Sequence, residues 1–181
     1  MKITFELEQN DFLLHQLYIA SVSPSIKKRR WMNRMLVPLF FSLIALYVYF
    51  QNGWSDVVIP LSLGLLWYVL YPIFDRRVFL KHYQLFIDEN FKQKLNCKQS
   101  LEFFDDYIFS CESGNESKIV ASSVIKIIEL DQIILIQLNS GNSFILPKVK
   151  IENIECIKNY LKTWANGLNI EYKNEKNWKF K

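Results

Sequence analysis

The stretch Met35–Phe74, MLVPLFFSLIALYVYFQNGWSDVVIPLSLGLLWYVLYPIF, decides how this chain folds. Asp56 is the only charged side chain in these 40 residues. An α-helix rises about 1.5 Å per residue, so about 20 residues cross a hydrocarbon core about 30 Å thick. The stretch is too long for one membrane span and long enough for two. The sequence therefore predicts two transmembrane helices, over about residues 35–52 and 57–74.

A short polar segment, QNGWSD at residues 51–56, separates the two predicted spans. These residue types favour turns and belong in water or among lipid headgroups. Backbone amides cannot stay unpaired in lipid, so each span is expected to be helical. Two alternatives fit less well. A buried hairpin of a soluble protein would have a polar face, and neither half has one. A signal peptide would not begin at residue 35, after three acidic residues.

Basic residues flank the hairpin and predict its orientation. Five precede the first span and three follow the second, whereas the connecting loop has none. Cytoplasmic loops carry the excess of Lys and Arg, so both termini are expected in the cytoplasm. The same side chains are candidate contacts for anionic lipid. They are Lys27, Lys28, Arg29, Arg30, Arg34, Arg76, Arg77 and Lys81. Trp31, Trp54 and Tyr71 are the candidate aromatic residues of the membrane interfaces.

The remaining sequence predicts a second, water-exposed part. Residues 1–8 alternate between apolar and polar side chains, which indicates a half-buried strand. A helix is expected from about residue 11 to 22, and another from 77 to about 96. From residue 99 the pattern changes to strands, with one region over 101–109 and turns at 112–116 and 139–142. A closing helix is expected over 152–165, with Gly167 just beyond its end.

The expected fold is an α+β membrane protein in which the hairpin interrupts one cytosolic domain. A lone N-terminal strand is not stable, so it is expected to pair with the strands after residue 99. The expected parts are residues 1–26 (joining the cytosolic domain), 27–81 (the basic-flanked hairpin), 82–167 (an antiparallel β-meander closed by a helix) and 168–181. That last segment is a tail, either disordered or lying on the membrane surface.

The sequence contains no recognisable catalytic or metal-binding pattern. His15 and His82 lie far apart, and Cys97, Cys111 and Cys156 have no zinc-ligand spacing, so they are expected to be reduced thiols. The net charge of +4 comes from the hairpin flanks, which argues against a nucleic-acid footprint. We therefore expect no enzyme activity, no cofactor and no metal.

Three short segments and the order of elements resemble a known family. The segments are Ile3–Leu7 (ITFEL), Ser23-Pro24 before the basic cluster, and Phe144–Lys148 (FILPK) before the last helix. The chain resembles the YcxB-like family of bacterial membrane proteins over most of its length. The resemblance implies a multi-pass protein of the bacterial cytoplasmic (inner) membrane, with a cytosolic domain similar to pleckstrin-homology-like (PH-like) domains. It supplies no catalytic residues.

These expectations together favour a non-catalytic anchored protein. Its PH-like domain is expected to bind a protein, a peptide or a lipid headgroup at the inner leaflet. The alternative is an immunity or resistance protein that protects the membrane against a toxin or bacteriocin. A channel subunit would need several copies, because two spans cannot enclose a pore. The expected partners are the lipid bilayer and an unknown protein or peptide. A second copy of the chain, in a homo-oligomer, is a further candidate partner.

Overall fold

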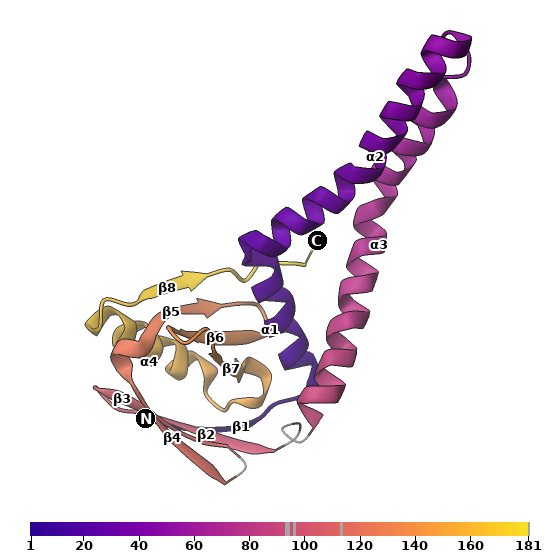
Figure 1. Cartoon of the computed structure of the whole chain (residues 1–181). Helices are drawn as coiled ribbons and strands as arrows, with labels where there is room; N and C mark the ends of the chain where they lie inside the picture. The colour runs from indigo at the N-terminus through magenta and orange to yellow at the C-terminus, as the bar shows by residue number, and fades with distance from the viewer. Residues whose placement is uncertain (93–94, 96, 113, 181) are drawn as a thin grey trace. The chain divides into compact units, whose positions relative to one another are not determined.

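The computed structural model describes residues 1–92, 95, 97–112 and 114–180, and it has an α+β fold. The chain forms two compact units (Figure 1). One unit comprises Met1–Gln16 and Gln84–Lys179, and the other comprises Leu17–Tyr83 and the end of the chain from Phe180. Helices α1 (Gln9–Val22) and α3 (Val58–Asn90) contribute residues to both units.

The first sheet contains the N-terminal strand. Its order is β1 (Lys2–Glu6), β2 (Lys98–Phe103), β3 (Tyr107–Glu112) and β4 (Asn115–Val120), and all neighbours are antiparallel. The inward residues of β1 pack in the core, and Ile3 lies opposite Leu101 of β2. The N-terminal strand therefore pairs with a strand that follows the hairpin, which is the pairing expected from the sequence.

The single strand region expected over residues 101–109 is wrong, because the chain reverses direction within it. The backbone N–H of Phe104 donates to the carbonyl of Tyr107 at 2.9 Å and closes a turn that contains Asp105 and Asp106. Two carboxylates in succession favour a solvated turn over a strand interior. The next expected turn, 112–116, is shorter, because β4 already begins at Asn115. Ser113 lies outside the described residues.

The second sheet has the order β7-β6-β5-β8. Its strands are β5 (Val124–Glu129), β6 (Ile133–Leu138), β7 (Ser143–Pro147) and β8 (Glu171–Asn174), with 3₁₀ turns η2 (Ala121–Ser123) and η3 (Lys148–Lys150) between elements. The expected turn between β6 and β7 is confirmed, with Gly141 at φ +85°. The tail expected to be disordered or membrane-bound instead adds β8, parallel to β5.

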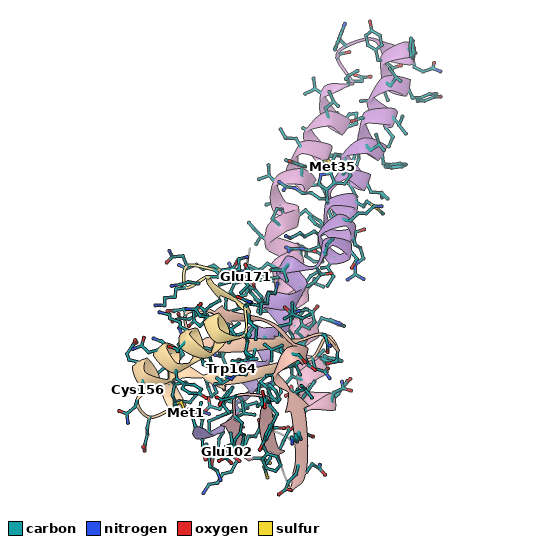
Figure 2. All side chains as sticks on the ribbon, turned by 90° about the vertical axis from the view of Figure 1, so that its left-hand side faces the viewer. Met1, Met35, Glu102, Cys156, Trp164 and Glu171 are labelled. Atoms are coloured by element: carbon teal, nitrogen blue, oxygen red, sulfur yellow. The ribbon has the colours of Figure 1, made fainter. Side chains whose placement is uncertain are left out.

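Helix α4 (Ile154–Gly167) closes this unit with an apolar stripe. Its Trp164, labelled in Figure 2, packs edge-to-face on Phe103 of the first sheet, with ring centroids 5.7 Å apart. The Trp164 Nε1–H donates to the carbonyl of Phe104 at 3.0 Å, which satisfies the one polar atom of the indole. The helix begins and ends two residues later than the expected range of 152–165, so it includes Gly167. Asn169, at φ 54°, is the left-handed residue instead.

The other unit contains a helical hairpin of α2 (Pro24–Asn52) and α3. Their 29 and 33 residues correspond to about 44 and 50 Å, more than the two predicted spans. Pro38 and Pro72 lie near the ends of the predicted spans, at residues 35 and 74. In the longer helices of the structure, both prolines lie in the helix interior. α3 ends at Asn90, and the expected end at Asn96 lies outside the described residues. Gly64 is the point of close approach, because an added Cβ would lie 3.4 Å from the Pro38 Cα.

A buried carboxylate joins several elements of the two-sheet unit. Glu129, at the end of β5, is 0% exposed. Its Oε1 lies 3.0 Å from Lys148 Nζ, 3.3 Å from Lys176 Nζ and 3.6 Å from Lys158 Nζ. The Tyr172 hydroxyl of β8 donates to Oε2 at 3.0 Å. Glu129 thus connects β5 to η3, α4, β8 and the segment after β8.

The surroundings of Glu129 determine its ionisation. Burial alone would raise its pKa, but hydrogen bonds from Lys148 and Tyr172, with the Lys148 charge, lower the pKa to about 2. Burial and the hydrogen bond to Glu129 raise the pKa of Tyr172. Glu129 is therefore an anion and Tyr172 a neutral donor at physiological pH.

Glu129→Gln should destabilise the chain, because it leaves buried lysine ammonium groups without their anion. We expect a loss of about 3 kcal/mol in the free energy of unfolding. The native carboxylate stabilises the fold above pH 4.5, its ordinary pKa, and this contribution falls away as the pH drops toward 2. The variant should therefore lose part of this acid dependence. Guanidinium unfolding in a non-ionic detergent, followed by near-UV circular dichroism, measures both effects.

Glu155→Gln is the matched control for this prediction. Glu155 also contacts Lys158, at 2.5 Å, but its side chain is 77% exposed. Because solvent screens an exposed pair, its loss should leave the unfolding midpoint unchanged. Equal midpoints for the Glu129→Gln variant and the wild type would contradict the structural role of the buried carboxylate.

Candidate functional site

The surface of the hairpin is apolar and exposed. Of the most apolar 18 residues of α2 only 6% are buried, and of those of α3 22%. Core helices of soluble proteins are mostly buried, so the low buried fraction of α2 and α3 distinguishes these two helices from core helices. Side chains project outward along both helices around Met35 in Figure 2. Exposed members include Leu36, Leu39, Phe40, Leu43, Phe50, Val58, Ile59, Leu65, Leu66, Val69 and Ile73. Both helices are long and apolar enough to cross a membrane.

An ion pair joins the two helices at the open end of the hairpin. The Arg30 Nε of α2 donates to Asp75 Oδ2 of α3 at 2.5 Å. The Tyr71 hydroxyl, one helical turn before Asp75, donates to its Oδ1 at 3.0 Å. Asp75 and Tyr71 are both buried. The carboxylate therefore has a charged and a neutral donor on its two oxygens, a combination that makes a partly buried charge tolerable.

Aromatic rings surround the same arginine. The Arg30 guanidinium lies 5.2 Å from the ring centre of Phe79 and 5.1 Å from that of Phe180. Phe180 is only 7% exposed, so the end of the chain is packed against the hairpin. One turn along α2, Arg34 lies over the Tyr68 ring at 3.8 Å and donates to the Tyr68 carbonyl. Arg30, Asp75, Tyr71, Phe79 and Phe180, here called the hairpin clamp, hold its two helices together.

The structure separates the eight predicted basic residues into two groups. Arg30 and Arg34 are half-buried and contact α3. The others are exposed on α2 or α3 outside the two predicted spans, and they are Lys27, Lys28, Arg29, Arg76, Arg77 and Lys81. Because the ends of an antiparallel hairpin lie together, these six cations gather at the end with the clamp.

The three predicted interface aromatics have different environments. Trp31 is exposed on α2 near the six cations. Trp54 is exposed in the loop between the helices and packs edge-to-face on Tyr49, with centroids 4.9 Å apart. Tyr71 differs, because its ring is buried and its hydroxyl donates a hydrogen bond to Asp75.

The two-sheet unit offers few reactive groups. Within the described residues, no group of three or more His, Cys, Asp and Glu side chains could hold a metal ion. Burial lowers the pKa of His15 to about 4, so this imidazole is neutral at physiological pH. Among the described residues, Cys97, Cys111 and Cys156 form no disulfide bond.

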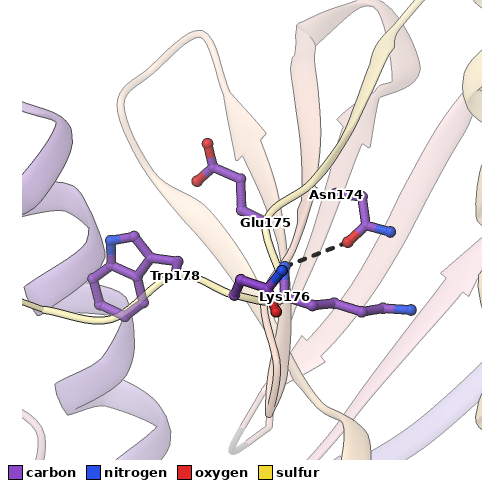
Figure 3. Close-up of a pocket in the computed structure, with 5 residues that line it drawn as sticks. Asn174, Glu175, Lys176 and Trp178 are labelled. Carbon is purple, nitrogen blue, oxygen red and sulfur yellow. Dashed lines mark hydrogen bonds between the residues drawn. The ribbon is translucent and has the colours of Figure 1, made fainter.

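A shallow depression follows β8, lined by residues 174–178 (Figure 3). The backbone N–H of Lys176 donates to Asn174 Oδ1 at 3.4 Å, and that of Trp178 donates to the carbonyl of Glu175 at 2.9 Å. Figure 3 shows the Lys176 and Trp178 side chains leaving this turn in opposite directions. Since Lys176 already contacts Glu129, the depression is best explained as the surface of a turn that fixes β8.

The sequence alone does not identify several residues that stabilise the hairpin and the two-sheet unit. It predicts no structural role for Asp75 or Glu129. Gly64 lies against Pro38 and Phe41 although the sequence has no GxxxG motif that would predict tight helix pairing. Two signals were present. Asp75 directly follows the apolar stretch, and Glu129 is a single charge in the run Ile127–Leu130.

The clamp makes a quantitative prediction. Arg30→Met and Asp75→Asn should each lower the melting temperature in detergent, because each leaves a partly buried group without its partner. The double variant should lose less than the sum of the two, with a coupling free energy of about 1 kcal/mol or more. Arg29→Met removes a neighbouring exposed cation and should have little effect. Strict additivity of the two single effects would show that the pair does not join the helices.

Comparison with known proteins leaves the family open. No family model matches this chain, and no curated protein matches it in sequence. The resemblance to the YcxB-like family therefore stays a prediction, and function has to be inferred from the residues of this chain.

Proposed function

We propose that this chain is a non-catalytic protein of the bacterial cytoplasmic membrane. The α2–α3 hairpin anchors it, and both termini lie in the cytoplasm. The two-sheet unit is then a cytosolic interaction domain, PH-like as in the YcxB-like family, that binds a protein, a peptide or a lipid headgroup at the inner leaflet. One observation carries the anchoring: within residues 35–74, the exposed surface of the two long helices is almost entirely apolar.

The energetic argument for a membrane is direct. Burial of apolar surface is worth roughly 25 cal/mol per Å², so a hairpin with this many exposed apolar side chains is costly in water. Monomeric soluble proteins rarely expose contiguous apolar patches of more than a few hundred Å². Lipid removes this cost, and the helical backbone satisfies its own hydrogen bonds there.

The distribution of charge supports the orientation. Six exposed cations lie at the open end of the hairpin, whereas the loop at residues 53–57 carries only Asp56. The positive-inside rule then places the open end in the cytoplasm. The clamp is compatible with this position, because the interface supplies water for Arg30 while the apolar rings cover its other side.

The architecture of the two-sheet unit supports binding rather than catalysis. Its buried charges, centred on Glu129, are satisfied internally and stabilise the fold. Sheet edges and exposed apolar side chains such as Val149 remain available to a partner. Peptide-binding modules commonly use such edges and grooves.

Labelling of single cysteines tests the anchoring. In spheroplasts, a membrane-impermeant maleimide should label Ser55→Cys in the hairpin loop. It should reach the native Cys156 only after permeabilisation. Each site is tested with the other cysteines replaced by serine, and the full chain should stay in the membrane pellet after an alkaline carbonate wash. Labelling of Cys156 in intact spheroplasts would reverse the orientation, and release by carbonate would contradict the span assignment.

Photo-crosslinking in cells tests the interaction domain. A benzophenone amino acid at Val149, an exposed apolar residue, should yield a defined adduct because the unit binds a partner. The same probe at Ser55 should not yield this adduct, because the loop faces the other side of the membrane. Identical adducts from both positions, or none from a series of exposed positions in the unit, would contradict the proposed role.

A further inference from the structure

Strand β4 is an open edge of the first sheet. The sheet order places β3 on one side of β4, and among the described residues no strand pairs with its other side. The opposite edge strand, β1, has neighbours, since it contacts β7 of the second sheet. Five of the six residues of β4 are exposed. Its outer backbone groups are therefore accessible to an added strand.

The hydrogen-bond pattern identifies which residues of β4 face outward. The backbone N–H of Ala121 donates to the carbonyl of Asp106 at 2.8 Å. This bond makes Tyr107 and Val120 a non-hydrogen-bonded pair, because an antiparallel ladder bonds the residues that flank such a pair. The two pair types alternate along the ladder. The backbone groups of Glu116, Lys118 and Val120 therefore point away from β3.

Two of these outward residues carry opposite charges. Glu116 and Lys118 are two positions apart, so their side chains lie on the same face of the strand. Both residues are exposed. An antiparallel copy of the same strand can therefore align Glu116 with Lys118 of the other copy, and Lys118 with its Glu116, about a two-fold axis at Ser117.

Neighbouring registers lack this complementarity. Only the outward residues of the two β4 strands can hydrogen-bond to each other, so the allowed registers differ by shifts of two residues. Each such shift moves the two-fold axis by one residue. An axis at Glu116 would put two carboxylates opposite each other, and an axis at Lys118 would put two ammonium groups opposite each other. Like charges in directly opposed positions destabilise a strand pair. The charge pattern therefore selects the register with Ser117 opposite Ser117.

We propose that the chain forms a two-fold homodimer in which the β4 strands of two copies pair antiparallel, with Ser117 on the axis. The first sheets of the two copies then continue as one sheet across the dimer. The contact is isologous, so it closes at two copies and does not propagate. It rests on the proposed function in one respect: hairpins in one membrane confine both copies and favour a short contact.

Disulfide trapping tests the register. In a chain whose native cysteines are replaced by serine, Ser117→Cys should form a dimer under mild oxidation in isolated membranes. Opposed residues of a non-hydrogen-bonded pair have Cα atoms about 4.5 Å apart, within disulfide range. Lys118→Cys is the matched control, because its two Cα atoms would lie about 8 Å apart. We expect at least a fivefold higher dimer yield for Ser117→Cys. Equal yields would overturn the register.

Charge reversal tests the complementarity. In the Ser117→Cys background, Glu116→Lys places two lysines opposite each other, and Lys118→Glu places two glutamates opposite each other. Each single reversal should lower the dimer yield several-fold. The double reversal restores opposite charges across the axis and should restore the yield. Failure of the double variant to recover, with its membrane level unchanged, would overturn the proposal.

A backbone variant separates this dimer from other occupants of the edge. Lys118→Pro removes an outward N–H, whereas Lys118→Ala removes the same charge and keeps the N–H. Proline should abolish the dimer seen by cross-linking of the otherwise native chain, and alanine should only weaken it. A wild-type chain that stays monomeric, with another protein cross-linked to β4, would overturn the proposal. Carbonate extraction of the same samples reports independently on the membrane anchor.

Discussion

The antiparallel pairing of β1 with β2 constrains everything between them. Glu6, at the end of β1, lies directly opposite Lys98, at the start of β2. The intervening chain must therefore leave the sheet and return to a neighbouring point. A helical hairpin satisfies this condition, because its two open ends lie together, whereas a single long helix would carry the chain away. If the hairpin spans a membrane, the same constraint requires an even number of spans between β1 and β2 and places these two strands on one side.

The hairpin is held together at positions with different chemistry. Within the apolar stretch, Gly64 lets α3 approach the backbone of α2 at Pro38, where packing depends on shape alone. At the open end, the contact becomes ionic, through Arg30 and Asp75. This order is physically sensible. Small residues allow close packing where lipid offers no hydrophobic drive between helices, and charges occur only where water or an interface can solvate them.

The sequence predicted those elements whose signal is local. The signals for a helical hairpin in the apolar stretch, a strand within Met1–Glu8 and a turn at Gly141 each come from adjacent residues, and the structure contains all three elements. Prediction failed where the cause is distant in sequence. Strand β8 contains only four residues, and it pairs with β5, more than 40 positions earlier, where Tyr172 also donates a hydrogen bond to Glu129. Likewise, Asp75 became a clamp residue only because Arg30, 45 positions earlier, faces it.

The composition of β4 bears on how the two-sheet unit protects an open sheet edge. Proteins commonly protect edge strands with lysine, which repels any added strand. Glu116, two positions before Lys118, changes this effect. Like charges still oppose each other when the axis lies at Glu116 or Lys118, whereas opposite charges face each other when the axis lies at Ser117. Such a pattern suppresses indiscriminate strand addition while permitting a single, closed pairing. A short edge contact is weak in solution, and in the proposed function the confinement of both copies to one membrane would compensate for that weakness. The hairpin would then serve assembly as well as anchoring.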